Sequence, residues 1–302
     1  MHVTIPRGPI ELAAELHLPH ELDEADPLRA VVLSTPGSSV KEQIGANYAA
    51  GLAARGIAAL VFDPAHQGQS GGEPRDLEDP YRRSEDISYA IDALTAIPGI
   101  DPHRIGVLGI CAGGGYAIHT ARTDHRIRAV GAVDPGDIGS SFRGFQADGP
   151  VAALDALAEA RLEEVRTGVL TRENWLPDTL EDAEAAGVTD VDLLQAITYY
   201  RTDRGRNEHS TNRRLSRGDS LLLGFDPFHL VDQLMTQPLQ LILAENLDGT
   251  GFDTSGERLW KLAPNPVDRL VIPGARHYEM YDVPEYVDAA VDRLATFYQN
   301  HL

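Results

Sequence analysis

Cysteine is almost absent from this sequence, because position 111 is the one place where it occurs. A single thiol cannot form a disulfide within the chain or join a cysteine cluster around a metal ion. The chain also lacks an apolar run of about 18 residues, the length that a membrane span needs. Residues 1–6 show no basic start followed by an apolar stretch. We therefore expect no membrane partner, no secretory signal and a cytoplasmic protein.

Positive charge is also scarce, with 26 Lys and Arg residues against 46 Asp and Glu, a net charge of -20. Binding to phosphate groups needs clustered basic side chains, so we expect no nucleic acid as a partner. One basic cluster departs from this pattern. These arginines either pair with the acidic helices before them or meet an anionic, carrier-linked substrate, and they are Arg201, Arg204, Arg206, Arg213, Arg214 and Arg217.

Apolar strands alternate with helices over most of the chain. Continuous apolar strands of this kind are typical of a mostly parallel sheet that helices cover on both faces. Acidic helices interrupt the alternation between positions 139 and 223, which predicts a helical cap inserted into an α/β core of residues 1–138 and 224–302. The predicted strands of the sheet are 30–34, 58–62, 105–110, 129–133, 239–243 and 269–272.

The strongest chemical signal is the segment Gly109-Ile110-Cys111-Ala112-Gly113, which directly follows a predicted strand and opens a helix. It matches the Gly-x-nucleophile-x-Gly elbow, with cysteine in the position that serine usually occupies. The start of a helix carries partial positive charge, which favours a thiolate at Cys111. The backbone N–H of Ala112 is the expected first donor of an oxyanion hole.

Two other interpretations of this segment compete with the elbow. A lone cysteine is often a small buried apolar residue, and a glycine-rich turn between strand and helix also binds dinucleotides. The glycine spacing does not match Gly-x-Gly-x-x-Gly, and Asp134-Pro135 follows too early to hold a ribose. We therefore favour a cysteine nucleophile.

A thiol nucleophile needs a base and an acid that orients the base. In enzymes with this elbow, the chain order is nucleophile, acid, histidine. His277 is the histidine that lies just beyond a late strand, so it is the predicted base. Asp248 follows the preceding strand and is the predicted acid, with Glu245 and Asp253 as competitors.

Two further parts of the site follow from position in the chain. The loop after the strand at 30–34 should supply the second oxyanion donor, and we expect the N–H of Ser38 there, beside Gly37. Tyr199 and Tyr200 of the cap are the expected wall of an acyl pocket.

The sequence resembles the dienelactone-hydrolase-like branch of the α/β-hydrolase family, which includes bacterial hydrolases and polyketide-transferase-like proteins with a cysteine nucleophile. The resemblance implies the α/β-hydrolase fold and a Cys-His-Asp triad of Cys111, His277 and Asp248. The sequence departs from the family at Pro36, where many relatives have histidine. The stretches that carry it are residues 41–43, 63–72, 74–75, 104–116, 274–277 and 281–282.

These observations predict a hydrolase that acts on an ester, lactone or thioester through an S-acyl intermediate, without cofactor or metal. Its partner would be a small-molecule acyl substrate. Two alternatives stay open: an acyltransferase that passes a polyketide or fatty acyl chain to an alcohol or amine, and a non-catalytic scaffold of the same fold that binds a ligand or partner. Assembly as a homodimer also stays open.

Overall fold

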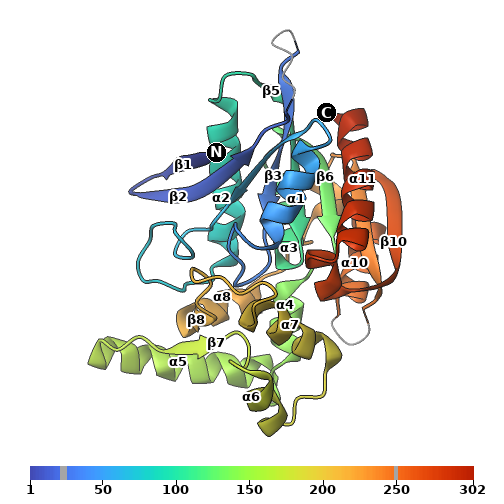
Figure 1. Cartoon of the computed structure of the whole chain (residues 1–302). Helices are drawn as coiled ribbons and strands as arrows, with labels where there is room; N and C mark the ends of the chain where they lie inside the picture. Colours follow the sequence, from blue (N-terminus) through green and yellow to red (C-terminus); the bar gives the residue numbers. More distant parts are fainter. Residues whose placement is uncertain (21–25, 248–250) are drawn as a thin grey trace.

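An eight-stranded sheet forms the centre of the protein in the computed structural model, which describes residues 1–20, 26–247 and 251–302 (Figure 1). The strand order is β1-β2-β4-β3-β5-β6-β9-β10. β2 pairs antiparallel with β1 and β4, and the other neighbours run parallel. The strands are β1 (His2–Arg7), β2 (Ile10–His17), β3 (Leu28–Ser34), β4 (Ala58–Phe62), β5 (Ile100–Ile110), β6 (Ile127–Val133), β9 (Leu239–Asn246) and β10 (Pro266–Arg276).

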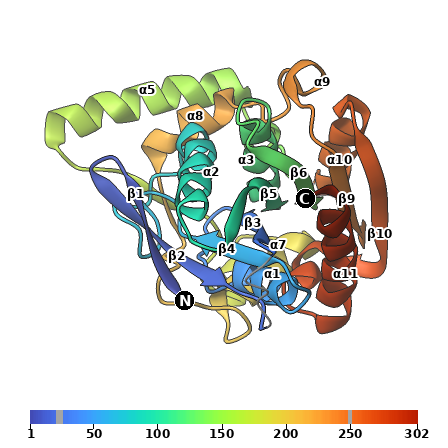
Figure 2. The same ribbon diagram turned by 90° about the horizontal axis from the view of Figure 1, so that it is seen from above.

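Helices cover both faces of this sheet, as the view from above shows (Figure 2). α1 (Ile44–Ala53) packs beside α11 (Pro284–His301), and α2 (Pro80–Thr95) packs beside α3 (Ala112–Ala121). The central strands β3, β4 and β6 are apolar and buried along most of their length, because both of their faces are covered. The predicted α/β fold with a mostly parallel sheet is confirmed.

Two strands are longer than the sequence pattern indicated. β5 begins at Ile100, where it already pairs with Leu28 of β3, whereas the apolar run suggested a start at Ile105. β10 continues to Arg276, which pairs with Asn246 of β9 across an irregular register. Backbone pairing with a neighbour extends both strands beyond their apolar residues, and the second extension carries β10 up to His277.

A group of elements between β6 and β9 gathers at one end of the sheet, and we call them the cap elements (Figure 1). Their helix α7 buries Tyr199 and Tyr200 against the core. The cap elements are α4 (Ile138–Gly144), α5 (Gly149–Thr167), β7 (Arg172–Asn174), α6 (Leu180–Ala185), α7 (Val191–Arg201), β8 (Arg213–Leu215), η1 (Ser216–Gly218) and α8 (Asp219–Gly224). Three short or late elements complete the chain: α9 (Val231–Leu234), α10 (Phe252–Leu262) and η2 (His277–Tyr281).

Several arginines of the basic cluster form ion pairs. Arg217 and Arg201 bind the earlier carboxylates Glu164, at 2.6 Å, and Asp178, at 3.1 Å. Arg214 binds Asp219 at 2.6 Å. Arg204 instead reaches out of the cap and binds Asp282, just after η2, at 2.6 Å. The ion pairs therefore hold the cap elements together and tie them to the core.

Membrane-spanning helices were searched for within residues 1–20, 26–247 and 251–302, and none there is long and apolar enough to cross a bilayer.

Candidate active site

Cys111 occupies the sharp turn between β5 and α3. Its backbone has φ 57° and ψ −128°, a conformation that a residue with a side chain rarely adopts. Three hydrogen bonds hold the turn: the Cys111 N–H donates to Val133 O at 3.0 Å, and its carbonyl accepts from the N–H groups of Gly114 at 2.9 Å and Gly136 at 2.8 Å. Such strain persists only where the surroundings enforce it, and it is common at catalytic residues.

Glycines in the first turn of α3 let neighbouring backbone approach the thiol closely. A Cβ on Gly113 would overlap the carbonyl of Ser34 at the end of β3. A Cβ on Gly115 would lie 2.5 Å from the carbonyl oxygen of Gly136. The glycine run after Cys111 therefore brings two loops beside the thiol, one after β3 and one after β6.

His277 begins η2 directly after β10 and is fully buried. Cys111 lies near enough to this imidazole to raise its pKa. On the other side of the ring, Nδ1 lies 3.3 Å from Oδ2 of Asp134. The angle of that contact falls short of a hydrogen bond, yet neither atom has another partner among the described residues. Because buried polar atoms are rarely left unpaired, we interpret the contact as the ion pair that orients His277.

The charge state of His277 follows from these neighbours. Burial acts against the imidazolium and lowers its pKa, but the charges of Cys111 and Asp134 and the polar contacts with both outweigh burial. Together they raise the pKa of His277 to about 10. The site therefore favours the charged imidazolium form of His277 at neutral pH.

Asp134 is the first residue after β6, and its carboxylate faces His277. Its N–H donates to Ile242 O at 2.9 Å, and Oδ1 accepts from the N–H of Ala244 at 2.8 Å. Both partners belong to β9, so the neighbouring strand fixes the carboxylate with Oδ2 free to face Nδ1.

The acid expected from chain order stays a prediction. Asp248 is outside the described residues. Of its competitors, Glu245 accepts the N–H of Gly274 at 2.8 Å, and Asp253 accepts the hydroxyl of Thr254 at 3.3 Å. Sequence reasoning did not single out Asp134 as the carboxylate that faces His277. One signal was present, an aspartate directly after the apolar strand that follows the helix of Cys111.

The loop after β3 is held firmly beside the elbow. Arg83 donates from Nη2 to the carbonyl oxygens of Thr35, at 2.6 Å, and Pro36, at 3.2 Å. Ser38 has φ 61°, and its carbonyl accepts from the Ser210 hydroxyl of the cap at 2.8 Å. Ala112 is the first residue of α3. The expected oxyanion donors thus stand on rigid backbone, and their role stays a prediction.

Aromatic rings enclose the imidazole. Phe252 stacks on His277 with ring centroids 4.0 Å apart and planes 3° apart. Tyr281 meets the imidazole from a second side, and Tyr199 and Tyr200 of α7 pack on Tyr281 at 5.1 Å and 6.3 Å. Cys111 keeps 9% of its surface exposed. The reacting atoms therefore lie in a nearly dry environment.

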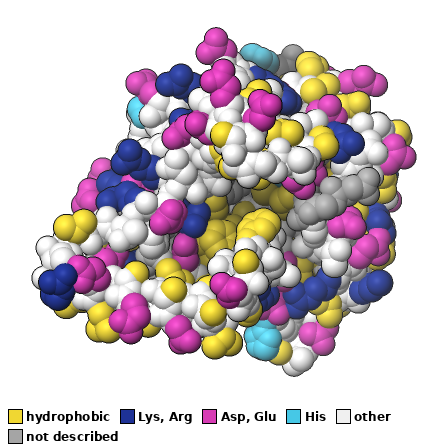
Figure 3. Space-filling view, turned by 90° about the horizontal axis from the view of Figure 1, so that it is seen from below, with side chains coloured by type: hydrophobic (Ala, Val, Ile, Leu, Met, Phe, Trp, Pro, Cys, Tyr) yellow, Lys and Arg dark blue, Asp and Glu magenta, His cyan; other side chains and the backbone are white. Residues whose placement is uncertain are grey.

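Apolar residues also collect in front of the loop after β3. The Trp175 ring lies against Gly37, together with Ile138. Phe142 meets Trp175 edge to face at 6.0 Å, and Arg214 covers both rings. Seen from the cap side, the surface has a hollow floored by hydrophobic side chains (Figure 3).

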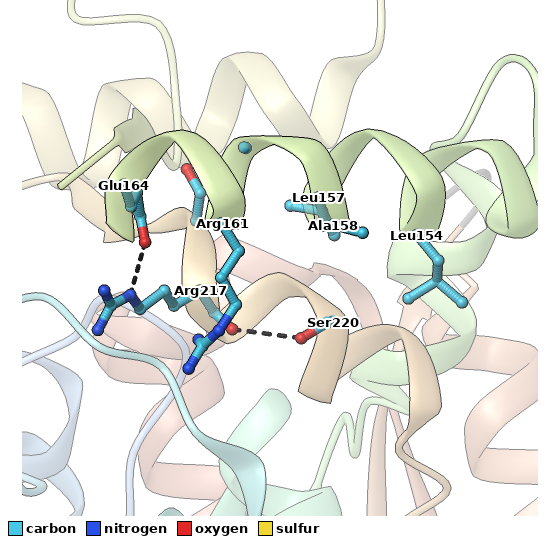
Figure 4. Close-up of a pocket in the computed structure, with 9 residues that line it drawn as sticks. Leu154, Leu157, Ala158, Arg161, Glu164, Arg217 and Ser220 are labelled. Carbon is cyan, nitrogen blue, oxygen red and sulfur yellow. Dashed lines mark hydrogen bonds and ion pairs between the residues drawn. The ribbon is translucent and has the colours of Figure 1, made fainter. Parts of the chain in front are cut away.

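A separate cavity of about 150 Å³ lies within the cap, between α5 and the segment of η1 and α8 (Figure 4). Its wall combines apolar residues of α5, such as Leu154 and Leu157, with Arg161 and the Arg217–Glu164 ion pair. All of its lining residues belong to the cap elements, so this cavity is distinct from the cluster of Cys111.

Comparison with known proteins identifies the family. The model of the Alpha/beta hydrolase family matches residues 35–291. The uncharacterized protein YcjY of Escherichia coli (strain K12) is 35% identical over 296 residues, which are 97% of this chain and 95% of that protein. The crystal structure of the hypothetical protein PA2218 from Pseudomonas aeruginosa superposes with a TM-score of 0.89, at 29% identity, over 100% of this chain and 93% of that one.

A shorter similarity reaches a protein named for its activity. The thiohydrolase aneE of Aspergillus aculeatus is 38% identical over 106 residues, which are 35% of this chain and 33% of that protein. These similarities, with the sheet and its helices, support an enzyme of the hydrolase or acyltransferase kind. The chain belongs to the alpha/beta hydrolase family.

Proposed function

We propose that this enzyme hydrolyses an acyl thioester or activated ester through a covalent S-acyl intermediate on Cys111. His277 is the base and Asp134 is the acid that orients it. One observation carries the proposal: the sole thiol of the chain contacts a buried imidazole whose far nitrogen faces a carboxylate at 3.3 Å. A nucleophile, a base and an orienting group in this order form the arrangement that covalent acyl transfer requires.

The first half of the reaction forms the acyl-enzyme. The Cys111 thiolate attacks the carbonyl carbon, a C–S bond forms, and the electron pair of the C=O bond moves to the oxygen. The N–H groups of Ala112 and Ser38 then stabilise that oxyanion. When the carbonyl reforms, the bond to the leaving group breaks, and the leaving thiol or alcohol takes the Nε2 proton of His277.

The second half releases the acyl chain. Neutral His277 removes a proton from water, the water oxygen attacks the thioester carbon, and collapse expels the Cys111 thiolate. Asp134 supports the imidazolium that forms in both halves. The protein regains the ion pair with which it began.

The surroundings favour an apolar acyl chain. Trp175, Ile138 and Phe142 stand in front of the oxyanion loop, and burial of an acyl chain against them removes apolar surface from water. Tyr199 and Tyr200 contribute to the wall on the side of η2. Cysteine suits activated acyl groups, and the similarity to a thiohydrolase agrees with a thioester.

Acyl transfer to an alcohol or amine is the second candidate. The observation that favours it is the enclosure of His277, which has no exposed surface. An acceptor that brings its own apolar surface could displace water from such a site. Product analysis in the presence of alcohols distinguishes the two outcomes.

Intact-mass spectrometry tests the proposal. The wild-type protein, mixed with a slowly released acyl thioester, should gain the mass of one acyl group, and Cys111→Ala should gain none. The proposal fails if the wild type never carries the adduct and Cys111→Ala keeps full turnover.

A further inference from the structure

Tyr281 places a hydroxyl at the atom on which the proposed mechanism depends. Its Oη lies 3.0 Å from Nε2 of His277, the nitrogen that exchanges protons with the nucleophile and the leaving group. Cys111 lies near enough to the same side chain to raise the pKa of its hydroxyl. The residue is 1% exposed, so its hydroxyl depends on these two partners.

The backbone around Tyr281 is fixed from two directions. Its carbonyl accepts from Nδ2 of Asn47 at 2.9 Å, and the carbonyl of Met280 accepts from the Tyr48 hydroxyl at 3.0 Å. Both donors lie on α1. From the cap side, Arg204 donates to the carbonyl of Tyr278 at 2.8 Å. Because core and cap both hold η2, the hydroxyl of Tyr281 keeps its place relative to the imidazole.

We propose that Tyr281 is a catalytic residue of this enzyme, whose hydroxyl accepts the Nε2–H of His277 and donates its own hydrogen to the sulfur of Cys111. The proposal rests on the function proposed above. In the resting enzyme, the thiolate then receives a hydrogen bond from a neutral phenol in addition to the charge of the imidazolium. Hydrogen bonds to a charged atom are stronger than those between neutral groups.

The same hydroxyl has a role after acylation. Once the C–S bond forms, the sulfur loses its negative charge and accepts hydrogen bonds only weakly. The phenol, which keeps its proton throughout, is then free to donate to the oxygen of the incoming water or alcohol beside Nε2. Tyr281 would thus hold the acceptor where His277 can remove its proton.

The neighbouring groups keep this phenol neutral. Burial, and then the charge of Cys111, raise the pKa of Tyr281 well above its ordinary value. The phenols of Tyr200 and Tyr278 act in the same direction. The carboxylates of Asp134 and Asp192 interact through their charges with the imidazole of His277. Tyr281 therefore remains a hydrogen-bond donor throughout the pH range in which the enzyme can work.

Tyr278 supplies a matched control. It lies on the same element and packs its ring edge to face on His277, with centroids 4.8 Å apart and planes at 83°. Tyr278→Phe removes the same atom from the same kind of side chain, one turn away. A loss confined to Tyr281→Phe therefore reports the hydrogen bonds of that hydroxyl and not the packing of a ring.

The experiment is the alkylation of the sole thiol with iodoacetamide between pH 5 and pH 10, followed by intact mass. Tyr281→Phe should slow alkylation about tenfold near pH 6 and move the pH midpoint upward by about one unit, the loss expected for one hydrogen bond to a charged atom. Tyr278→Phe should follow the wild type, and melting temperatures show that each variant is folded. Identical profiles for Tyr281→Phe and the wild type would overturn the role.

A second substitution keeps the test decisive if Tyr281→Phe does not fold. 3-Fluorotyrosine at position 281 retains the hydroxyl and makes it a stronger donor, so the midpoint should move downward; an unchanged midpoint contradicts the role. The acyl adduct of the wild type is measured in the same assay. If that adduct is absent, the proposed function fails; if it forms while the profiles coincide, only the role of Tyr281 fails.

Discussion

Asp134 Oδ2 and His277 Nδ1 meet at 3.3 Å, although one residue precedes the cap elements and the other follows the last strand. Asp134 directly follows β6, and its carboxylate accepts the N–H of Ala244 in β9. The Asp134 carboxylate thus reaches the histidine from β6, the strand beside β5, whereas chain order pointed to the loop after β9.

This relationship predicts the effect of amide substitutions. Asp134→Asn should lower kcat about a thousandfold, because an amide cannot support the imidazolium, while it can still accept the N–H of Ala244. Asp248→Asn should leave kcat nearly unchanged. Steady-state kinetics of both variants decide the assignment, and the reverse pattern would identify Asp248 as the acid.

Replacement of the nucleophile gives a second prediction. Cys111→Ala should abolish turnover and leave the melting temperature close to that of the wild type, because the change removes one atom at a turn that backbone hydrogen bonds hold. Cys111→Ser should lose most of the activity on thioesters, since its hydroxyl must first give up a proton to His277. A Cys111→Ser variant as active as the wild type would show that the site is not tuned to a thiolate.

The protonation of His277 gives a third prediction. Its pKa is raised from 6.5 to about 10, so the charged pair stabilises the fold fully below about pH 6.5, and this contribution is lost as the pH rises through about 10. In NMR spectra, the ring of the wild type should be doubly protonated at pH 8. Cys111→Ala removes the largest favourable charge and should give a neutral ring at that pH; an unchanged ring would contradict the ion pair.

The walls of the site give a fourth prediction. Trp175→Ala should change the preference among acyl chain lengths, because Trp175 is half-buried in front of the oxyanion loop. Tyr200→Ala opens a hole in a buried aromatic cluster and should cost about 3 kcal/mol of folding free energy, so Tyr200→Phe is the better probe there. Rates on acyl thioesters of two to twelve carbons test both, and a uniform loss on every length would argue against a wall at Trp175.

The sequence predicts those features that neighbouring residues determine. Apolar runs mark the central strands, and the glycines around Cys111 identify a strained turn because only glycine fits there. The sequence likewise predicts that His277 lies just beyond a late strand, and β10 ends at Arg276. The role of Asp134 could not be predicted in this way, because it depends on which strand end comes to face His277. The strand end that faces His277 is determined by the pairing of β6 with β9. It also depends on the close approach of the Gly136 carbonyl to Gly115 of α3.

The contacts of Asp137 matter for chimeras in which the cap elements are replaced by those of a relative. Its Oδ1 accepts the N–H of Ser140 and caps α4, the first cap helix, while Oδ2 binds Arg258 of α10 at 2.7 Å. Asp137 lies three positions after Asp134, so its two contacts fix the backbone between Asp134 and the first of the cap elements. A chimera joined before Asp137 would replace this residue and its contacts, and we expect Asp134 to shift. A chimera joined after Ile138 would keep Asp137 and the position of Asp134. A chimera that exchanges the cap elements should therefore keep the position of Asp134 when its first junction lies after Ile138.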